Sequence, residues 1–160
     1  MKRFTRKATA TWLRNRQNGK SSVTTSIATL KNVRCFSSGN RALGGTSPPE
    51  LISAAHAGSF SMALARELGK AGYSPDQIDT TATVTMENLP AGWTIIRVNL
   101  DVTATVPNAL QCDFIDAALS AKKNCAISRL LNVNISMRAK LKRGAAVAQI
   151  LPRAGIRFGV

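Results

Sequence analysis

Regular alternation of apolar and polar positions predicts a pair of strands in the middle of the chain. Residues 94–106 (TIIRVNLDVTATV) carry an apolar side chain at every second position, with Arg, Asn, Asp or Thr between them. This period of two is typical of a strand with one buried and one solvent-facing side. Residues 80–87 (TTATVTME) repeat the pattern, and NLPAGW at 88–93 supplies the turn. We predict a two-stranded meander whose buried face carries Ile96, Val98, Leu100, Val102, Ala104 and Val106.

Strands are also predicted at both ends of the patterned region. Residues 7–13 and 21–30 are rich in Thr, Val, Ile and Trp in partial alternation, and Asn18-Gly19 between them is a strong hairpin signal. Residues 132–142 alternate through Val133, Ile135, Met137, Ala139 and Leu141. The chain is therefore expected to open with an antiparallel hairpin and to place its last strand near residue 140.

A long helix is predicted between the first strands and the meander. Thr46 or Ser47 serves as the N-cap, two prolines follow at the first helical positions, and Glu50 lies in the first turn. The helix is expected to run to about Leu68 and to be ended by Gly69 and Gly72.

Two further helices are predicted before the last strand. Residues 113–123 place Phe114, Ile115, Ala118 and Leu119 on one stripe. Asn124 is the expected N-cap of a short helix at residues 125–131. Strands followed by a helix, two strands, helices and a strand indicate an α+β fold in one domain at residues 1–143. The tail at 144–160 has no clear period and is left without a predicted structure.

The composition limits the class of protein and of site. No apolar run reaches the ~20 residues of a membrane span, and the N-terminus lacks the apolar stretch of a secretory signal, so a cytoplasmic protein is expected. Cys35, Cys112 and Cys125 are an odd set without CxxC spacing, which argues against disulfides and zinc. With one histidine in the chain, we expect no metal and no cofactor.

The charge is strongly positive. The net charge is +14, and the first 49 residues contain ten Lys or Arg and no Asp or Glu. Such an excess attracts polyanions. The basic residues are spaced singly and no series of aromatic residues accompanies them, so we expect at most weak, non-specific binding of nucleic acid, with a solvated basic face as the alternative.

The predicted long helix is unusual at residues 54–64 (AAHAGSFSMAL), which carry almost only small side chains. Larger apolar residues would bury more surface, about 0.8 kcal/mol per extra methylene, so the segment serves something other than bulk burial. His56 and Ser59, three positions apart, share one region of the helix surface. A serine hydrolase is not indicated, because G-x-S-x-G is absent and no third group is found to orient the histidine.

Cys125 is a second candidate for reactivity. It directly follows Asn124, the expected N-cap, where the helix dipole and free N–H groups favour a thiolate, and Lys122 and Lys123 add positive charge. The competing interpretation is a buried, inert thiol.

Three segments closely resemble the OsmC/Ohr family of osmotically inducible proteins C and organic hydroperoxide resistance proteins. They are GGTSPPELISAAHAGSFSMALARELGKAGYSPDQIDTTATVTMENL, GWTIIRVNLDVTATVP and KKNCAISRLLNVNISMRAKL, within a similarity that covers about residues 5–142. The resemblance implies an intertwined homodimer of α+β subunits, with antiparallel sheets around central helices and active sites at the subunit interface. Close approach of the central helices would account for the small residues at 54–64.

The resemblance also assigns roles to residues. In the family motif A-A-H-A-x-C-F-S-M-A-L, the cysteine attacks an organic hydroperoxide, becomes a sulfenic acid and condenses with a second cysteine. Cys125 in NCAIS matches the second, resolving cysteine. Glu50 in PPEL matches a glutamate that holds an arginine beside the thiolate and the peroxide.

Two positions depart from the family pattern. Ser59 stands where the family has its peroxidatic cysteine, and serine forms no sulfenic acid and has a far higher pKa. Counting back from Glu50 without gaps places Gly39 at the arginine position, with Arg41 two residues away as the candidate replacement. An engineered Cys-to-Ser variant and a natural member that has lost the reaction both fit this pattern.

Three functions follow as hypotheses. The first is an OsmC-family thiol peroxidase that reduces organic hydroperoxides in oxidative and osmotic stress, with a dithiol such as a lipoyl group as reductant; at Ser59 this chain lacks the nucleophile. The second is a non-catalytic homodimer that binds a small molecule in the interfacial pocket. The third is a basic protein associated with polyanions, which predicts a salt-dependent affinity for nucleic acid.

Overall fold

A computed structural model describes residues 5–13, 20–27, 29–35 and 45–142. Its elements, in chain order, are β1 (Ala8–Leu13), β2 (Lys20–Thr25), β3 (Val33–Arg34), α1 (Pro48–Lys70), β4 (Gln77–Leu89), β5 (Gly92–Thr105), α2 (Gln111–Asn124), α3 (Ala126–Leu130) and β6 (Asn134–Lys142). The strands form two separate three-stranded sheets, in the orders β1-β2-β3 and β4-β5-β6. The predicted α+β class is confirmed. The tail at 144–160 lies outside the described residues.

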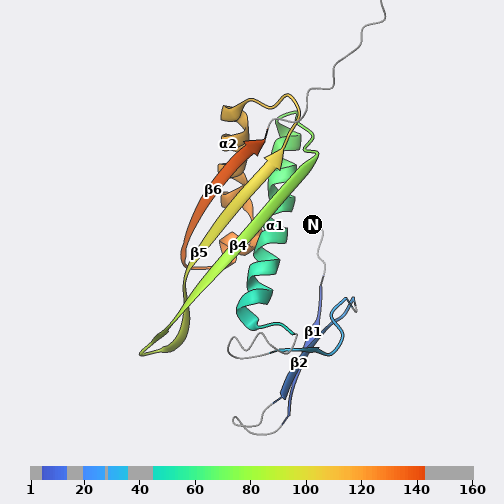
Figure 1. Ribbon diagram of the computed structural model, residues 1–160, viewed down its shortest axis with the longest axis vertical. Coiled ribbons are helices and arrows are strands. Elements are labelled where there is room, and N and C mark those ends of the chain that lie inside the picture. Colours follow the sequence, from blue (N-terminus) through green and yellow to red (C-terminus); the bar gives the residue numbers. More distant parts are fainter. Residues whose placement is uncertain (1–4, 14–19, 28, 36–44, 143–160) are drawn as a thin grey trace, which may run out of the picture.

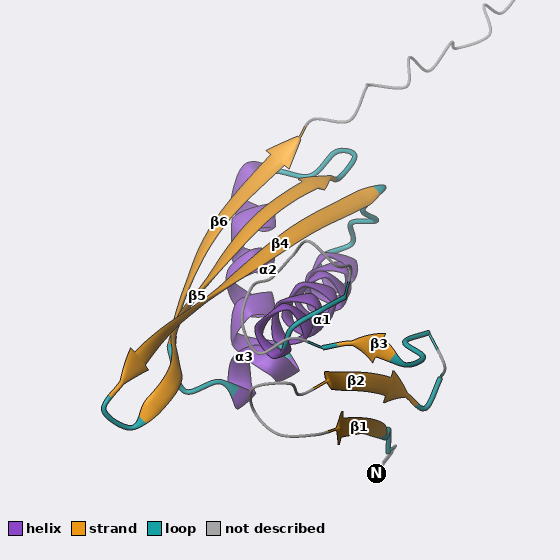
Figure 2. Ribbon diagram, turned by 60° about the horizontal axis from the view of Figure 1, so that its bottom comes forward, coloured by secondary structure: helices purple, strands orange, loops and turns teal. Residues whose placement is uncertain are grey.

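The N-terminal sheet is antiparallel throughout. β1 pairs with β2 in register from Ala8–Thr25 to Leu13–Lys20, as the hairpin prediction requires, while the Asn18-Gly19 turn itself lies outside the described residues. β2 ends at Thr25 rather than at the predicted residue 30, and the short strand β3, which was not predicted, pairs with it. The sheet lies apart from the helices and from β4–β6 (Figures 1 and 2).

The C-terminal sheet is mixed rather than antiparallel. β4 and β5 form the predicted hairpin, but β6 runs parallel to β5, in register from Arg97–Asn134 to Thr105–Lys142. A parallel neighbour requires a crossover connection, and α2 and α3 supply it. β6 begins two residues after the predicted start.

The predicted buried face of β5 is confirmed from Val98 onwards and wrong at Ile96. Val98, Leu100, Val102, Ala104 and Val106 are all buried. Near the hairpin end, Thr85 pairs with Arg97 but Met86 pairs with Ile95, so one extra residue is inserted in β5. Such a bulge reverses the inward and outward positions beyond it. Ile95, not Ile96, therefore packs against the core.

Helix α1 is capped at both ends by local sequence. The Ser47 side chain accepts a hydrogen bond from the Glu50 N–H, and prolines occupy the first helical positions. At the other end the Tyr73 N–H donates to the Leu68 carbonyl and the Gly72 N–H to the Gly69 carbonyl, with Gly72 at a φ of +84°. This is a Schellman motif, which needs a residue that tolerates a left-handed conformation. Gly72 ends the helix as predicted, whereas Gly69 lies inside its last turn.

The second and third helices differ from the predicted ones in two details. The buried stripe of α2 is Phe114, Ala117, Ala118 and Ala121, while Leu119 is 54% exposed. Asn124 is the last residue of α2 and does not cap α3; Cys125 occupies the N-cap position between the two helices. The backbone turns at Cys125, which adopts an extended conformation with φ −62° and ψ 128°.

The core lies between the C-terminal sheet and the pair α1 and α2, which cover one of its faces (Figure 2). One stripe of α1 points into it, formed by His56, Phe60, Ala63, Leu64, Glu67 and Leu68. The small residues Ala54, Ala55 and Gly58 of the same helix lie on its exposed side. Within the described ranges, no helix is long and apolar enough to cross a membrane.

Candidate active site

The structure brings Ser59 and Cys125 into direct contact. Ser59 lies in the middle of α1, and Cys125 lies 66 positions later at the junction of α2 and α3. The Cys125 thiol donates a hydrogen bond to the Ser59 hydroxyl, with 3.3 Å between sulfur and oxygen. Cys125 is fully buried and belongs to the hydrophobic core, while Ser59 is half-buried. The Ser59 side of the pair is therefore the more accessible one.

The surroundings of Cys125 favour its ionised form. Burial raises the pKa of the thiol, since a charge is poorly solvated in the core. When the sulfur is ionised, it can instead accept hydrogen bonds from the Ser59 hydroxyl, from the backbone and side chain of Ser128 and from the backbone of Ile127, and these bonds lower the pKa. Together they outweigh burial, and the pKa of Cys125 lies below its ordinary value. A lowered thiol pKa is the property that distinguishes reactive cysteines from inert buried ones.

His56 contacts the same group of residues from the buried side of α1. Its Nε2 lies 2.9 Å from the Ser128 hydroxyl oxygen, across the α1–α3 contact. The imidazole is fully buried, and desolvation lowers the pKa of His56, so the ring is neutral at neutral pH. Its Nδ1 is buried and has no hydrogen-bond partner among the described residues.

Glu50 lies at a different place on α1. Its carboxylate accepts hydrogen bonds from the hydroxyls of Thr46 and Ser47, at 3.4 and 3.2 Å, and the side chain is exposed. Nine positions separate Glu50 from Ser59, about 13 Å along a helix axis. Within one chain the glutamate therefore contacts the N-terminal end of α1 and not the Ser59–Cys125 pair. Arg41 and Gly39 lie outside the described residues.

Ser128 is a site residue that the sequence analysis missed. It follows Cys125 by three positions in the motif NCAIS, the spacing that places side chains on one face of a helix. That spacing was the available signal. Its contact with His56 depends on how α3 packs against α1, which the spacing does not reveal.

Glu67 is a second missed polar group, two helical turns beyond Ser59. Its buried carboxylate accepts hydrogen bonds from Lys70 at 2.9 Å and from Asn124 at 3.4 Å, and it pairs with Arg66 at 3.6 Å. The hydrogen bond from Lys70 lowers the pKa of Glu67 most, so the group stays ionised. Asn124 thus joins the end of α2 to α1 instead of capping α3.

The remaining cysteines lie elsewhere. Cys35 is buried beside the N-terminal sheet, where its backbone forms a bridge with Thr46, and Cys112 is exposed at the start of α2. Both are free thiols, as is Cys125. Among the residues with described placement, no three His, Cys, Asp or Glu side chains are grouped so that they could hold a metal ion.

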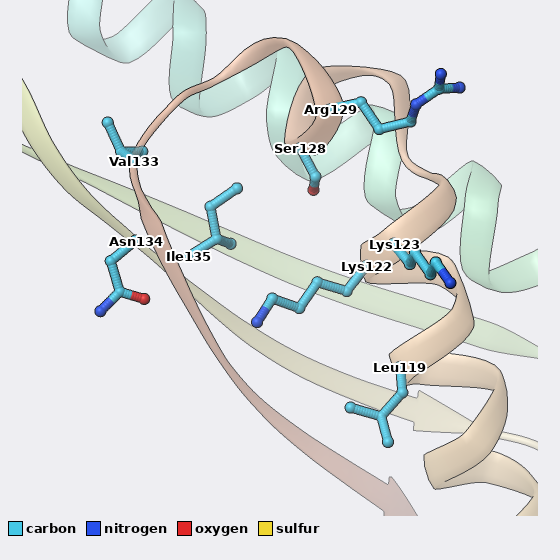
Figure 3. A pocket seen from close by; sticks show the side chains of 8 residues that line it. All are labelled: Leu119, Lys122, Lys123, Ser128, Arg129, Val133, Asn134 and Ile135. Atoms are coloured by element: carbon cyan, nitrogen blue, oxygen red, sulfur yellow. The ribbon is translucent and has the colours of Figure 1, made fainter.

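A cleft of about 520 Å³ lies beside this site, between the α2–α3 corner and the start of β6 (Figure 3). Its walls are formed by Leu119, Lys122, Lys123, Ser128, Arg129, Val133, Asn134 and Ile135. Lys122 reaches across the opening, and the Ser128 hydroxyl points into it (Figure 3). In the described part of the chain, no acidic side chain lies within salt-bridge distance of the three basic ones. The cleft therefore combines an uncompensated positive charge with an apolar wall.

Comparison with known proteins gives a consistent result at the level of sequence and fold. A family model described as OsmC-like protein matches residues 38–140. The peroxiredoxin OsmC of Escherichia coli (strain K12) is 37% identical over 139 residues, which span 86% of this chain and 96% of that protein. The peroxiredoxin OsmC of Shigella flexneri matches with the same values.

Solved structures share the fold at lower sequence identity. An OsmC-like protein of unknown function from Vibrio cholerae superposes with a TM-score of 0.70 at 13% identity, over 86% of this chain and 99% of that one. The organic hydroperoxide resistance protein OhrB of Bacillus subtilis gives 0.64 at 19% identity, over 87% and 98%. With the family match covering more than half of its residues, the chain belongs to the family of OsmC-like proteins.

Proposed function

We propose that the chain carries the hydroperoxide-reducing site of OsmC-family peroxiredoxins, with position 59 as the peroxidatic position and Cys125 as the resolving thiol. The observation that carries the proposal is the 3.3 Å contact between Ser59 Oγ and Cys125 Sγ. Two residues 66 positions apart meet at the distance that a peroxidatic and a resolving sulfur would need before they form a disulfide. The match to peroxiredoxin OsmC over most of both chains supports the same assignment.

The proposed reaction needs two sulfur atoms, of which this chain supplies one. A thiolate at position 59 would attack the terminal oxygen of a hydroperoxide; the O–O bond breaks, the sulfur becomes a sulfenic acid, and the alkoxide takes a proton to leave as an alcohol. The Cys125 thiol would then displace water from the sulfenic acid and form a disulfide, which an external dithiol reduces. Serine cannot undergo the first oxidation. The chain with Ser59 therefore holds the resolving half of the site without its peroxidatic half.

The direct test is to restore the missing sulfur. We expect Ser59→Cys to raise the rate of organic hydroperoxide reduction, with a dithiol as reductant, by several orders of magnitude, because loss of a catalytic nucleophile costs turnover on that scale. Peptide mapping of the oxidised variant should show a single disulfide between positions 59 and 125. Ser59→Ala is the matched control and should be as inactive as the parent chain.

Two outcomes would contradict this proposal. Fast turnover by the parent chain would show that Cys35, Cys112 or Cys125 reacts with peroxide directly. A folded Ser59→Cys variant without activity would show that the site lacks its other groups, such as the arginine for which Arg41 is the candidate. The dithiol reductant and a cytoplasmic compartment, where thiols stay reduced, belong to the same proposal.

A second copy of the chain is the proposed partner. In the N-terminal sheet, the paired positions Ala10, Val23 and Val33 lie on one face together with Trp12, which is 54% exposed. No helix of the same chain covers this face to any extent in the described residues. An uncovered apolar face and the exposed small residues of α1 both suit contact with another subunit. The homodimer would also offer a route for Glu50 of one subunit to approach the Ser59–Cys125 pair of the other.

A second candidate function is supported by the cleft at the α2–α3 corner. Three basic side chains, Lys122, Lys123 and Arg129, stand beside an apolar wall, which suits an organic anion with a short apolar tail. Octanoate is a suitable probe for titration calorimetry at low salt. Binding that is lost in Lys122→Gln but kept in the control Lys140→Gln would support a small-molecule-binding role, and equal binding by both variants would exclude the cleft as its place.

A further inference from the structure

Within the described part of the chain, His56 Nδ1 has no hydrogen-bond partner, and this favours one tautomer of the buried ring. A neutral imidazole carries one N–H and one bare nitrogen. If Nδ1 carried the hydrogen, a buried N–H donor would be left without an acceptor, and such orphan donors are rarer in proteins than orphan acceptors. The hydrogen therefore belongs on Nε2, which lies 2.9 Å from the Ser128 oxygen. His56 is the donor in this contact and Ser128 the acceptor.

The direction of that bond determines where the proton of Ser128 points. A serine hydroxyl has one hydrogen to donate. Since His56 already donates to the oxygen, the Ser128 hydrogen is free to point to its other neighbour, the Cys125 sulfur. Ser59 reaches the same sulfur from α1. When Cys125 is ionised, two hydroxyl groups can donate to it at once, and each such bond stabilises the charged form.

We propose that His56 and Ser128 are positioning residues that stabilise the ionised form of Cys125, through a relay in which His56 orients Ser128 and Ser128 donates to the sulfur. This inference rests on the proposed function, because it concerns the sulfur assigned there to the resolving step. It adds two residues to the site and gives a role to the histidine and the serine that meet at the α1–α3 contact. The relay moves no electrons; it sets the position of one proton.

Charged groups on the surrounding elements also bear on the ionisation of Cys125. Glu67 on α1 is neutralised by Lys70 and Arg66. Lys122 and Lys123 on α2 and Arg129 on α3 are cations, which favour a thiolate at any nearby position. The strands contribute apolar side chains such as Val98 and Leu100 to the core cluster that contains Cys125. Hydrogen bonding is therefore the specific contribution that mutation can remove.

The test is a spectroscopic titration of Cys125 that needs no peroxide. In a Cys35→Ser/Cys112→Ser background, Cys125 is the only thiol, and its ionisation is followed by thiolate absorbance near 240 nm as pH is varied. The single tyrosine, Tyr73, interferes little, because its hydrogen bond to Asp113 raises its pKa. Circular dichroism confirms that each variant is folded.

We expect Ser128→Ala to move the midpoint to higher pH and to lower the thiolate fraction at a fixed pH by about tenfold, the effect of one lost hydrogen bond to a charged group. His56→Phe should move it in the same direction by less, since Ser128 keeps its hydroxyl but loses its orientation. Ser128→Thr, which retains the hydroxyl, should restore the parental midpoint and serves as the conservative control.

Double variants distinguish a relay from independent effects. His56→Phe should add nothing further in the Ser128→Ala background, because both changes interrupt the same path, whereas Ser59→Ala should add its own shift. Folded Ser128→Ala and His56→Phe proteins with unchanged midpoints would overturn the inference, as would shifts of the two variants that simply add. Since no peroxide is involved, a failed titration leaves the Ser59→Cys result untouched, and the reverse also holds.

Discussion

The two three-stranded sheets of this protein bury their apolar faces in different ways. The C-terminal sheet β4–β6 lies against α1 and α2, and five consecutive inward positions of the chain through β5 are buried. The N-terminal sheet β1–β3 also has an apolar face, formed by Ala10, Val23 and Val33, but it stands apart from the helices (Figure 2). Among the described residues, one sheet is covered by helices of its own chain and the other is not.

The difference supports the proposed homodimer, in which a second subunit would cover the N-terminal sheet. A sheet buries its apolar face against another layer, and a three-stranded sheet exposed on both faces gains little stability by itself. The candidate active site lies beside the complete layer, at the contact of α1 with the α2–α3 corner. Glu50, which the family resemblance assigns to the site, lies in the first turn of α1, near the bridge between Thr46 and Cys35 of the N-terminal sheet. Arg41 lies outside the described residues. In the proposed homodimer, the partner subunit would therefore cover the N-terminal sheet and complete the active site at the same interface.

The largest expected effect is on association. We expect a homodimer with a dissociation constant in the micromolar range or tighter, equivalent to about 8 kcal/mol or more. Ala10→Asp places a charge on the apolar face of β1 and should weaken association by about 3 kcal/mol, a factor of more than a hundred. Thr9→Asp, the matched control, alters the neighbouring residue on the opposite face and should leave association nearly unchanged. Sedimentation equilibrium measures both.

A folded monomer at micromolar concentration would contradict the proposal that a second subunit covers the N-terminal sheet. It would mean that β1–β3 is stable without a cover, or is covered by residues outside the described part of the chain. Equal weakening by Ala10→Asp and Thr9→Asp would point to a general effect of charge instead of a face-specific contact.

The next effect concerns the core of the complete layer. Leu100→Ala removes a fully buried side chain of β5 and should lower the free energy of unfolding by about 2–5 kcal/mol. Val23→Ala in the half-buried N-terminal sheet should lower it by less than about 1 kcal/mol in the Ala10→Asp background, where the partner is absent. Chemical denaturation of each variant gives both values. Equal losses would show that both sheets are buried within one chain.

A smaller effect is the response of stability to acid. Burial lowers the pKa of His56 in the folded protein, so the unfolded chain, with an ordinary histidine pKa near 6.5, binds protons more readily. Stability from this group is therefore complete above about pH 6.5 and is lost as the pH falls below it. We expect a loss of about 1 kcal/mol between about pH 7 and about pH 5.5, measured by denaturation at each pH.

His56→Phe provides the control for this acid response. The chain has only one histidine, so the variant should remove the pH dependence in that window. Glu67 contributes only at lower pH, because its pKa is lowered and its stabilisation is lost as the pH falls through that lowered value. A variant that keeps the full dependence would assign it to other groups.

The smallest effect is expected for nucleic acid. All acidic residues come after position 49, so the N-terminal segment that carries the β1–β3 sheet has only basic charged residues. We expect non-specific binding with a dissociation constant of about 10⁻⁴–10⁻⁶ M that weakens steeply with salt. Fluorescence anisotropy with Lys7→Gln/Arg34→Gln should show a smaller salt slope than with Lys140→Gln/Lys142→Gln. Sequence-selective binding at physiological salt would favour the polyanion hypothesis over the peroxidase one.

Local signals in the sequence were sufficient for most of the elements. Ser47 followed by two prolines and Glu50 defines the start of α1, because capping uses side chains and N–H groups only three positions apart. Gly72 defines its end, since few other residues adopt the left-handed conformation of a Schellman motif. Alternation identified the buried face of β5 from Val98 onwards. Each of these features depends on neighbours along the chain, and for that reason the sequence alone predicts it.

Other features required the packing of distant segments. Leu119 fits the helical stripe predicted for α2, yet it is exposed, because the rotation of a helix is decided by the layer it meets. Ile95 replaces Ile96 in the core, because pairing with β4 accommodates one extra residue. Asn124 contacts Glu67 instead of capping α3. Alternation identifies β6 as a strand but carries no information on its direction, which the crossover through α2 and α3 makes parallel to β5.

The candidate site divides in the same way. The sequence by itself, through family resemblance, determined that Ser59 and Cys125 are the positions to examine, and a chain of this composition was expected to hold no metal. Only the tertiary structure decided that their side chains meet at 3.3 Å, that Ser128 and His56 join them, and that the Glu50 carboxylate accepts hydrogen bonds from Thr46 and Ser47. The physical reason is that hydrogen bonds to a buried sulfur require groups from α1 and α3 at one point in space. Residues so far apart along the chain reach that point only when α1, α2 and the sheet pack around a common core.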